Sequence, residues 1–246
     1  MFSRKAARPS RHPLVLSLSD PQSPHLEAYR RLYRKILYLL QQNGSQVLCI
    51  TSAQGSEGKT LTGINLAFAM AEDPTKNVAL VDCDFRKPRV ARYLGIRSGP
   101  GVASVLRGER ALREVMTRAD DSRPNLSVFP AGRIEGDLYP FLYSKKLEPI
   151  LNQLRAGFDL VVADSPPILP ILDQDFLSDL ADAVLLVVRA GSASKDTVKA
   201  ALECTEGKKI LGVVFNGAKK QYSSYYSYTY GYDYRYDQDS DEESRC

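Results

Sequence analysis

The sequence of 246 residues contains no tryptophan, only two histidines and no long apolar run. A membrane-spanning helix needs about 20 mostly apolar residues, so the sequence predicts no such helix. The four cysteines form no C-x-x-C pair, and only two histidines are present, which argues against a metal site built from Cys and His. The N-terminus, MFSRKAARPSRHP, is basic but lacks the apolar core of a secretory signal. We therefore expect a cytoplasmic protein with reduced thiols.

The net charge of +4 is small and unevenly distributed. Residues 1–45 carry a net charge of +6, residues 219–246 carry −2, and the stretch between them is neutral. A neutral body argues against a dedicated nucleic-acid surface. The basic N-terminal stretch is compatible with anionic lipid or phosphate nearby, and equally with a solvated tail.

Short apolar runs alternate with helix-like stretches along the middle of the chain. The expected strands are 46–52, 77–84, 125–131, 158–164, 183–190 and 210–217. The expected helices are 23–44, which contains LEAYRRLYRKILYLL, and stretches near 60–72, 102–118, 138–155, 171–180 and 194–206. Consecutive apolar positions are typical of strands in a parallel sheet that is covered on both faces. The pattern predicts an α/β three-layer fold with a mostly parallel central sheet and ligands at the carboxyl ends of the strands.

Composition divides the chain into three parts. Residues 1–24 contain four prolines and read as a basic arm, and residues 25–218 form the predicted domain. Residues 219–246 are rich in tyrosine and acidic residues, of low complexity, and expected to be a disordered tail.

The stretch ITSAQGSEGKTLTG places a strand, a glycine-containing loop and a helix in the order that a phosphate-binding loop requires. It matches G-x-x-x-x-G-K-[ST], except that Ala53 stands at the first glycine. Lys59 is expected to reach the β- and γ-phosphates, and the Thr60 hydroxyl to bind Mg²⁺. The candidate nucleotide ligands are Gln54, Gly55, Ser56, Glu57, Gly58, Lys59 and Thr60. A Gly/Ser turn before an amphipathic helix is the structural alternative.

Two apolar strands end in aspartates. VALVDCDFR ends in Asp82 and Asp84 with Arg86 beyond them, and FDLVVADSPP ends in Asp164. Mg²⁺ prefers oxygen ligands, and Asp164 fits the carboxylate that holds it. One residue of the Asp82–Asp84 pair can face the metal and the other a nucleophile such as a tyrosine hydroxyl, whose proton a carboxylate can accept. Alternatively, these acids cap the next helix or pair with nearby basic residues.

Together these motifs resemble those of the bacterial tyrosine kinase (BY-kinase) family, the P-loop autokinases of capsule and exopolysaccharide export. SAQGSEGKT is similar to its Walker A motif, ALVDCDFR to Walker A′ and LVVADSPP to Walker B. The resemblance covers about residues 25–236 and implies ATP and Mg²⁺ as cofactors. It implies Asp82 as catalytic base together with Lys59, and Thr60, Asp84 and Asp164 as the Mg²⁺ ligands.

The resemblance also assigns roles at the edge of the site and on the first helix. Arg86 would be a nearby charge partner, and Asn216 would contact adenine, although an Asn in a strand-to-loop turn is the alternative. The family's E-x-x-R-x-x-R motif packs subunits into a ring, and here Glu27 and Arg30 match it. Tyr33 replaces the third residue, and a solvated helix face with Glu27–Arg31 pairs is the alternative.

The tail segment YSSYYSYTYGYDYRY supplies the candidate phosphoacceptors Tyr222, Tyr225, Tyr226, Tyr228, Tyr230, Tyr232, Tyr234 and Tyr236. The resemblance thus implies a tyrosine autokinase that phosphorylates this cluster in trans and regulates polysaccharide synthesis and export. The resemblance implies a membrane-bound activator that recruits the kinase to the inner face of the plasma membrane, and an opposing tyrosine phosphatase. A kinase that needs no activator is the alternative.

Two other functions remain open on the sequence. One is a MinD/ParA-like ATPase switch, and the other is a scaffold that binds ATP without transferring phosphate. In the MinD/ParA relatives a signature lysine precedes the invariant lysine by five residues. Gln54 stands at that position here, which favours the kinase. The tyrosine-rich tail is the second feature that favours it, although such polar tracts can also self-associate.

Overall fold

The computed structural model describes residues 11–16, 22–133, 136, 146–169, 177, 179–205 and 209–218. The chain divides into two compact units, Met1–Asn216 and Gly217–Cys246. Nearly all of the second unit, including the whole tyrosine cluster, lies outside the described residues, so the fold below is that of the first. Among the described residues, no helix has the length and hydropathy that a membrane span requires.

A mixed sheet forms the centre of the first unit, and its described strands run in the order β3-β4-β2-β5-β1-β6-β7. All neighbouring strands pair in parallel except β3 and β4, which are antiparallel. The strands are β1 Val47–Ser52, β2 Val78–Asp82, β3 Thr117–Arg118, β4 Leu126–Phe129, β5 Leu160–Asp164, β6 Ala183–Arg189 and β7 Ile210–Asn216. The predicted mostly parallel sheet is therefore confirmed.

Helices connect the strands and cover the sheet. The described helices are α2 Pro24–Asn43, α3 Lys59–Met70, α4 Val90–Leu94, α5 Val102–Leu106, α6 Leu112–Val115, α8 Leu147–Gly157 and α10 Lys195–Glu203. Helix α2 begins where Ser23 accepts a hydrogen bond from the backbone N–H of His25 and ends at Gly44, whose left-handed backbone suits a residue without Cβ.

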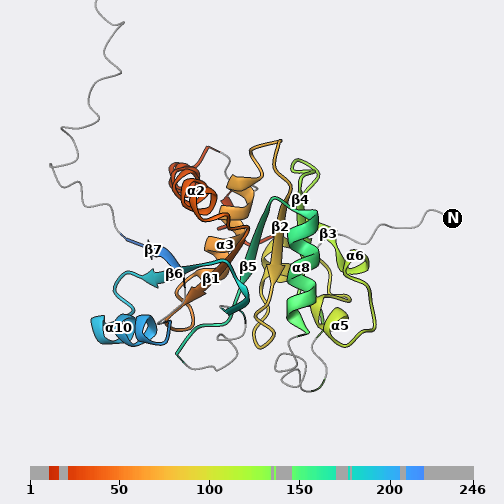
Figure 1. The fold of residues 1–246 in the computed structure, drawn as a ribbon. Helices are drawn as coiled ribbons and strands as arrows, with labels where there is room; N and C mark the ends of the chain where they lie inside the picture. The colour runs from red at the N-terminus through yellow and green to blue at the C-terminus, as the bar shows by residue number, and fades with distance from the viewer. Residues whose placement is uncertain are drawn as a thin grey trace, which may run out of the picture. The chain divides into compact units, whose positions relative to one another are not determined.

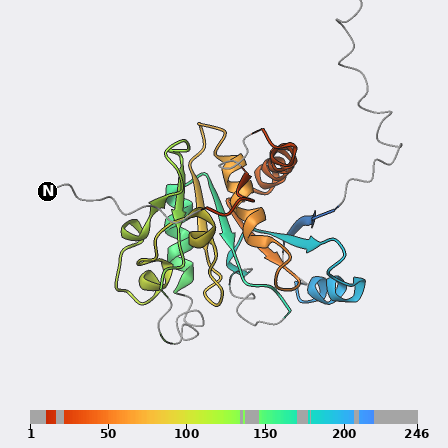
Figure 2. The same ribbon diagram turned by 180° about the vertical axis from the view of Figure 1, so that it is seen from behind.

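Alternate residues of the central strands enter two separate cores, one on each face of the sheet. Leu48 and Ile50 of β1 pack with α3, whereas Val47 and Cys49 of the same strand pack with the α8 side. Figures 1 and 2 show α2 and α3 on one face and α8 on the other. This two-sided burial explains why the strand sequences are apolar at consecutive positions, and it confirms the three-layer prediction.

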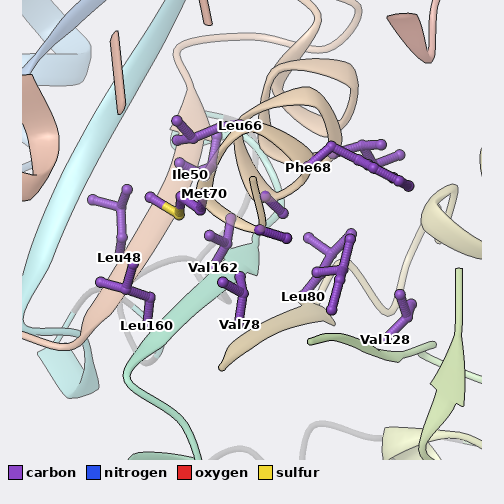
Figure 3. Packing of buried hydrophobic residues seen from close by; sticks show 14 of the residues in the cluster. Leu48, Ile50, Leu66, Phe68, Met70, Val78, Leu80, Val128, Leu160 and Val162 are labelled. Atoms are coloured by element: carbon purple, nitrogen blue, oxygen red, sulfur yellow. The ribbon is translucent and has the colours of Figure 1, made fainter. Parts of the chain in front are cut away.

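Helix α3 is the main packing element on its face. Leu66, Phe68 and Met70 belong to the same buried cluster as the labelled side chains of β1, β2, β4 and β5 (Figure 3). Phe68 is fully buried, and truncating such a side chain to alanine typically costs about 3–5 kcal/mol. These contacts hold α3 against the sheet, and the phosphate loop leads directly into this helix.

Some elements differ from the sequence prediction. The single helix expected near 102–118 is wrong: α5 and α6 are separate, and residues 117–118 form the edge strand β3. Gly108 interrupts the helical run with a left-handed backbone (φ +77°), a conformation that its lack of a Cβ permits. Helix α8 begins at Leu147, and the earlier part of the predicted 138–155 helix lies outside the described residues, as does most of 171–180.

The described part of the N-terminal arm, residues 11–16, lies against the domain. The buried Asn65 side chain of α3 donates to the carbonyl of Leu14 (2.9 Å) and accepts from the N–H of Leu16 (2.8 Å). Arg11 forms an ion pair with Asp120 at 2.6 Å. This segment therefore adds contacts to the helix that follows the phosphate loop, while the predicted division at residue 24 stays a prediction.

Asp182, the residue before β6, forms hydrogen bonds with the start of β1. Its carboxylate accepts hydrogen bonds from the N–H groups of Gln46 (2.9 Å) and Val47 (2.8 Å) and from the Arg155 guanidinium (2.8 Å). Burial alone would raise the pKa of Asp182, but the hydrogen bonds from Arg155, Val47 and Gln46 outweigh it and lower that pKa. The ionised form is therefore favoured in the folded protein.

We expect Asp182→Asn to lower the free energy of unfolding at pH 7 by about 1 kcal/mol, since the carboxylate is only partly shielded from water. A lowered folded-state pKa contributes stability above the unfolded pKa of about 3.9, and this contribution disappears as the pH falls through the folded value. Urea unfolding at pH 7, 5 and 3.5 should show the penalty shrinking in acid. A penalty that does not change with pH would contradict this, and the exposed Asp121→Asn is the control.

Candidate active site

The candidate site lies at the carboxyl ends of β1, β5 and β2, which are adjacent in the sheet. The register pairs Asp82 with Asp164 directly, and Ile50 of β1 also pairs with Asp164. The backbone N–H of Cys83 extends the ladder by donating to the Asp164 carbonyl at 2.8 Å. The two predicted acidic strand ends therefore meet beside the loop that follows β1.

The phosphate loop turns sharply before α3. Ser56 (φ +68°) and Gly58 (φ +93°) both have left-handed backbones, and Gly58 is the N-cap of α3. No side chain in the described part of the chain caps this end of the helix, so its first N–H groups and the positive end of its dipole are available to an anion. Ala53, at the usual first glycine, is fully buried.

The first two residues of α3 contact the acidic strand ends. The Lys59 ammonium lies 2.8 Å from an oxygen of Asp84 and 3.4 Å from one of Asp164. The Thr60 hydroxyl donates to the other oxygen of Asp164 at 2.7 Å. All four side chains are buried, so water screens these charges only weakly.

Asp82 is the most deeply buried of the three acids. One of its oxygens accepts from the N–H of Asp84 (3.2 Å), and the other accepts from the N–H of Val90 at the start of α4 (3.1 Å). Asp84 in turn accepts from the N–H of Lys87 at 3.0 Å. Asp82 and Asp84 therefore do make the capping contacts that the sequence offered as an alternative to a catalytic role. Asp84 also pairs with Lys59.

One ammonium faces three buried carboxylates, so negative charge is in excess. Burial and the charge of Asp164 raise the pKa of Asp82 well above its usual value. Burial likewise raises the pKa of Asp164, against the opposing effects of Lys59 and Thr60. Burial lowers the pKa of Lys59, but Asp164 and Asp84 outweigh it, so the net direction is upward. The site thus favours any species that adds positive charge or a proton.

The remaining predicted nucleotide ligands lie in the loop after β1, just beyond β2 and at the end of β7. Gln54, Gly55 and Arg86 are exposed. The side-chain amide of Asn216, at the end of β7, donates to the backbone carbonyl of Glu57 at 2.9 Å. The prediction from sequence missed this contact because 159 positions separate the two residues and no local pattern marks it.

Glu27 and Arg30, the predicted assembly residues, lie on α2 and make contacts within the chain. Arg30 forms a bidentate pair with Glu72 (2.7 and 2.9 Å), and Glu27 lies 3.7 Å from Arg30 and 3.4 Å from Arg31. The Glu27–Arg31 pair of the structural alternative is therefore present. The role of Glu27 and Arg30 in a ring stays a prediction, as do the tail phosphoacceptors, which lie outside the described residues.

We expect Gly58→Ala to weaken nucleotide binding about tenfold or more. A Cβ at this position would collide with the Asn216 side chain, and a left-handed alanine costs about 1–2 kcal/mol. Titration with a fluorescent ADP analogue measures the effect. Gly157→Ala, where a Cβ meets open space, is the matched control. Affinity within twofold of the wild type would show that the loop tolerates the side chain.

Comparison with known proteins supports a kinase. A family model described as an AAA domain matches residues 45–209. Tyrosine-protein kinase YwqD of Bacillus subtilis is 32% identical over 214 residues, which cover 86% of this chain and 89% of YwqD. The solved kinase domain of VpsO is 30% identical, with a TM-score of 0.70, over 79% of this chain and 97% of that one. Several other curated relatives are longer, and the chain spans only 27–31% of their length.

The septum site-determining protein MinD of Pyrococcus horikoshii, solved with Mg-ADP, has a lower TM-score of 0.58 at 23% identity, over 71% of this chain and 72% of that one. That likeness shows the fold alone, a nucleotide-binding P-loop architecture. The kinase relatives match more of the chain and share more of its residues. This chain therefore belongs to the bacterial tyrosine kinase family and carries that family's AAA-type nucleotide-binding domain.

Proposed function

We propose that this chain transfers the γ-phosphoryl group of ATP to tyrosine hydroxyls, including those of residues 222–236 in a second copy. The observation that carries the proposal is the contact of Lys59 and Thr60, directly after the phosphate loop, with Asp84 and Asp164. Asp82 pairs with Asp164 in the sheet beside them. Phosphoryl transfer needs positioning and charge stabilisation more than covalent chemistry, and this site offers both.

The loop and the start of α3 would hold the phosphates of ATP. Uncapped N–H groups and the helix dipole favour the β-phosphate, and the Lys59 ammonium is placed at the entry to α3. Arg86, exposed just beyond β2, would meet negative charge at the open side of the site. Asn216, at the end of β7, would lie close to the base.

Thr60, Asp84 and Asp164 fit a Mg²⁺ ion by the chemistry of their donors, which are all oxygen atoms. Among the described residues, no group of three or more His, Cys, Asp or Glu side chains has the arrangement of a metal centre. Mg²⁺ does not need one, since it commonly takes one or two carboxylates together with phosphate oxygens and water. When bound, the ion supplies positive charge to the phosphates, and Lys59 then has phosphate oxygens as alternative partners.

Asp82 would accept the proton of the attacking tyrosine. A free tyrosine hydroxyl has a pKa near 10, so a base that holds its proton well assists attack at neutral pH. Burial and Asp164 raise the pKa of Asp82, which makes it a stronger base than an exposed carboxylate. In the transfer, the tyrosine oxygen bonds to the γ-phosphorus, the bond to the ADP oxygen breaks, and the proton moves to Asp82.

Phosphorylation would change the charge of the tail strongly. Each phosphate adds about −1.5 to −2 charges, so a fully modified cluster of eight tyrosines would gain on the order of −12 to −16. Tails gathered in an oligomer would then repel one another, which offers a switch between assembled and dispersed states. We propose that this switch controls polysaccharide synthesis and export, through a membrane-bound activator that recruits the kinase to the plasma membrane and a phosphatase that resets it.

The ATPase switch and the inactive scaffold have less support. Gln54 is exposed at the position of the signature lysine of MinD/ParA ATPases, and its amide cannot supply that positive charge. An inactive scaffold would not need a buried carboxylate with a raised pKa beside the phosphate loop.

We expect Lys59→Met to abolish tail phosphotyrosine, and Asp82→Asn to reduce its rate by about 10²–10⁴-fold while ADP still binds. Transfer between copies is tested by mixing the Lys59→Met protein with an active chain truncated after residue 218. Phosphotyrosine on the Lys59→Met tail, identified by mass spectrometry, is the expected result. Phosphate release without any phosphotyrosine, with the membrane activator present, would instead favour the ATPase switch.

For the oligomer, we expect Glu27→Ala with Arg30→Ala to reduce the molecular mass measured by light scattering and to slow trans-phosphorylation. Glu72→Gln is the matched control, because it breaks the Arg30–Glu72 pair within the chain and leaves both helix residues in place. If both variants keep the wild-type mass, Glu27 and Arg30 serve the fold of one subunit only.

A further inference from the structure

Glu57 is the one acidic residue in the loop sequence AQGSEGKT, where a negative charge would repel the phosphates of a nucleotide. Its side chain is turned inward, however, and the residue is only 1% exposed. A carboxylate buried this deeply needs hydrogen-bond donors to offset the loss of water.

Two backbone N–H groups supply those donors. One carboxylate oxygen accepts from the N–H of Gln54 at the start of the loop (2.6 Å), and the other accepts from the N–H of Arg189 at the end of β6 (3.3 Å). Since both partners are donors, the site requires an acceptor at each oxygen. A carboxylate meets this requirement and an amide of the same shape does not.

The backbone of Glu57 is tied as well, because its carbonyl accepts from the Asn216 side chain at the end of β7 (2.9 Å). The residues on both sides, Ser56 and Gly58, have left-handed backbones. Such conformations persist only when surrounding contacts hold them. Glu57 therefore connects the turn of the loop to the ends of two strands that lie on the far side of β1 from the aspartates.

We infer that Glu57 is a positioning residue of the nucleotide site: its buried carboxylate ties the phosphate loop to the end of β6. The tie holds the loop's other N–H groups toward the phosphates and keeps the negative charge of Glu57 away from them. This inference deepens the proposed function, because it rests on nucleotide binding at this loop.

The substitution Glu57→Gln tests the inference, because it replaces the carboxylate with an amide of nearly the same volume. The amide NH₂ must face one of the two N–H donors, so one hydrogen bond is lost and the loop loosens. We expect the Kd for ADP, measured by calorimetry, to rise about tenfold, and the KM for ATP to rise in parallel. The kcat for tail phosphorylation should fall less than threefold, because saturating ATP restores the loop. Glu57→Asp, which keeps the acceptors on a shorter stem, should recover part of the affinity.

The direction in which the Kd for ADP changes in Glu57→Gln separates a positioning role from a purely electrostatic or a purely structural one. If Glu57 acts on phosphates only through its charge, Glu57→Gln binds ADP more tightly than the wild type, and the inference is overturned. A lower melting temperature with an unchanged Kd would show a structural role only and would equally overturn it. Glu203→Gln on α10, where the side chain is exposed and pairs with Lys199, is the matched control.

Hydrogen exchange in the wild-type protein keeps the inference testable if the variants do not fold. The Gln54 and Arg189 amides should exchange slowly without nucleotide, and exchange of the Gln54 amide at the rate of an open loop would refute the tie. The ADP measurements do not depend on kinase activity. An absence of phosphotyrosine in the wild type would therefore count against the proposed kinase function and leave the test of Glu57 intact.

Discussion

The parallel pairing of β5 with β1 on one side and β2 on the other is the constraint on which the site depends. It places Asp82 opposite Asp164 and brings both beside the loop that leaves β1. A register shift of one residue would turn these carboxylates to the other face of the sheet. The apolar residues before them, packed into a core on each face, keep the register in place.

The pairing of these strands also places several unfavourable interactions close together at one edge of the sheet. Lys59 is paired with Asp84 and Asp164, while Asp82 is buried nearby without such a pair among the described residues, and two residues of the phosphate loop have left-handed backbones. Charge excess and backbone strain of this kind are common where a protein binds a ligand, because the ligand supplies the missing charges and contacts. The two cores provide the stability that allows such a site to persist.

Helix α3 connects the site to the rest of the domain. Its first turn carries Lys59 and Thr60, and one face packs on the sheet. Asn65, farther along, binds the arm at Leu14 and Leu16. The arm and the phosphate loop therefore contact the same buried helix. Glu57 holds the loop from the other side, through its hydrogen bond with Arg189.

The parallel α/β class, the phosphate loop and the acidic strand ends could be predicted from sequence, because each is encoded by neighbouring residues with a regular period or spacing. The sequence did not reveal the break at Gly108, where a left-handed glycine overrides a helical pattern. The folded chain was needed to show which strands are adjacent, that the Glu57 side chain turns inward, and that Asn216 contacts the phosphate loop. These facts depend on contacts between residues far apart in the chain, which no local pattern records.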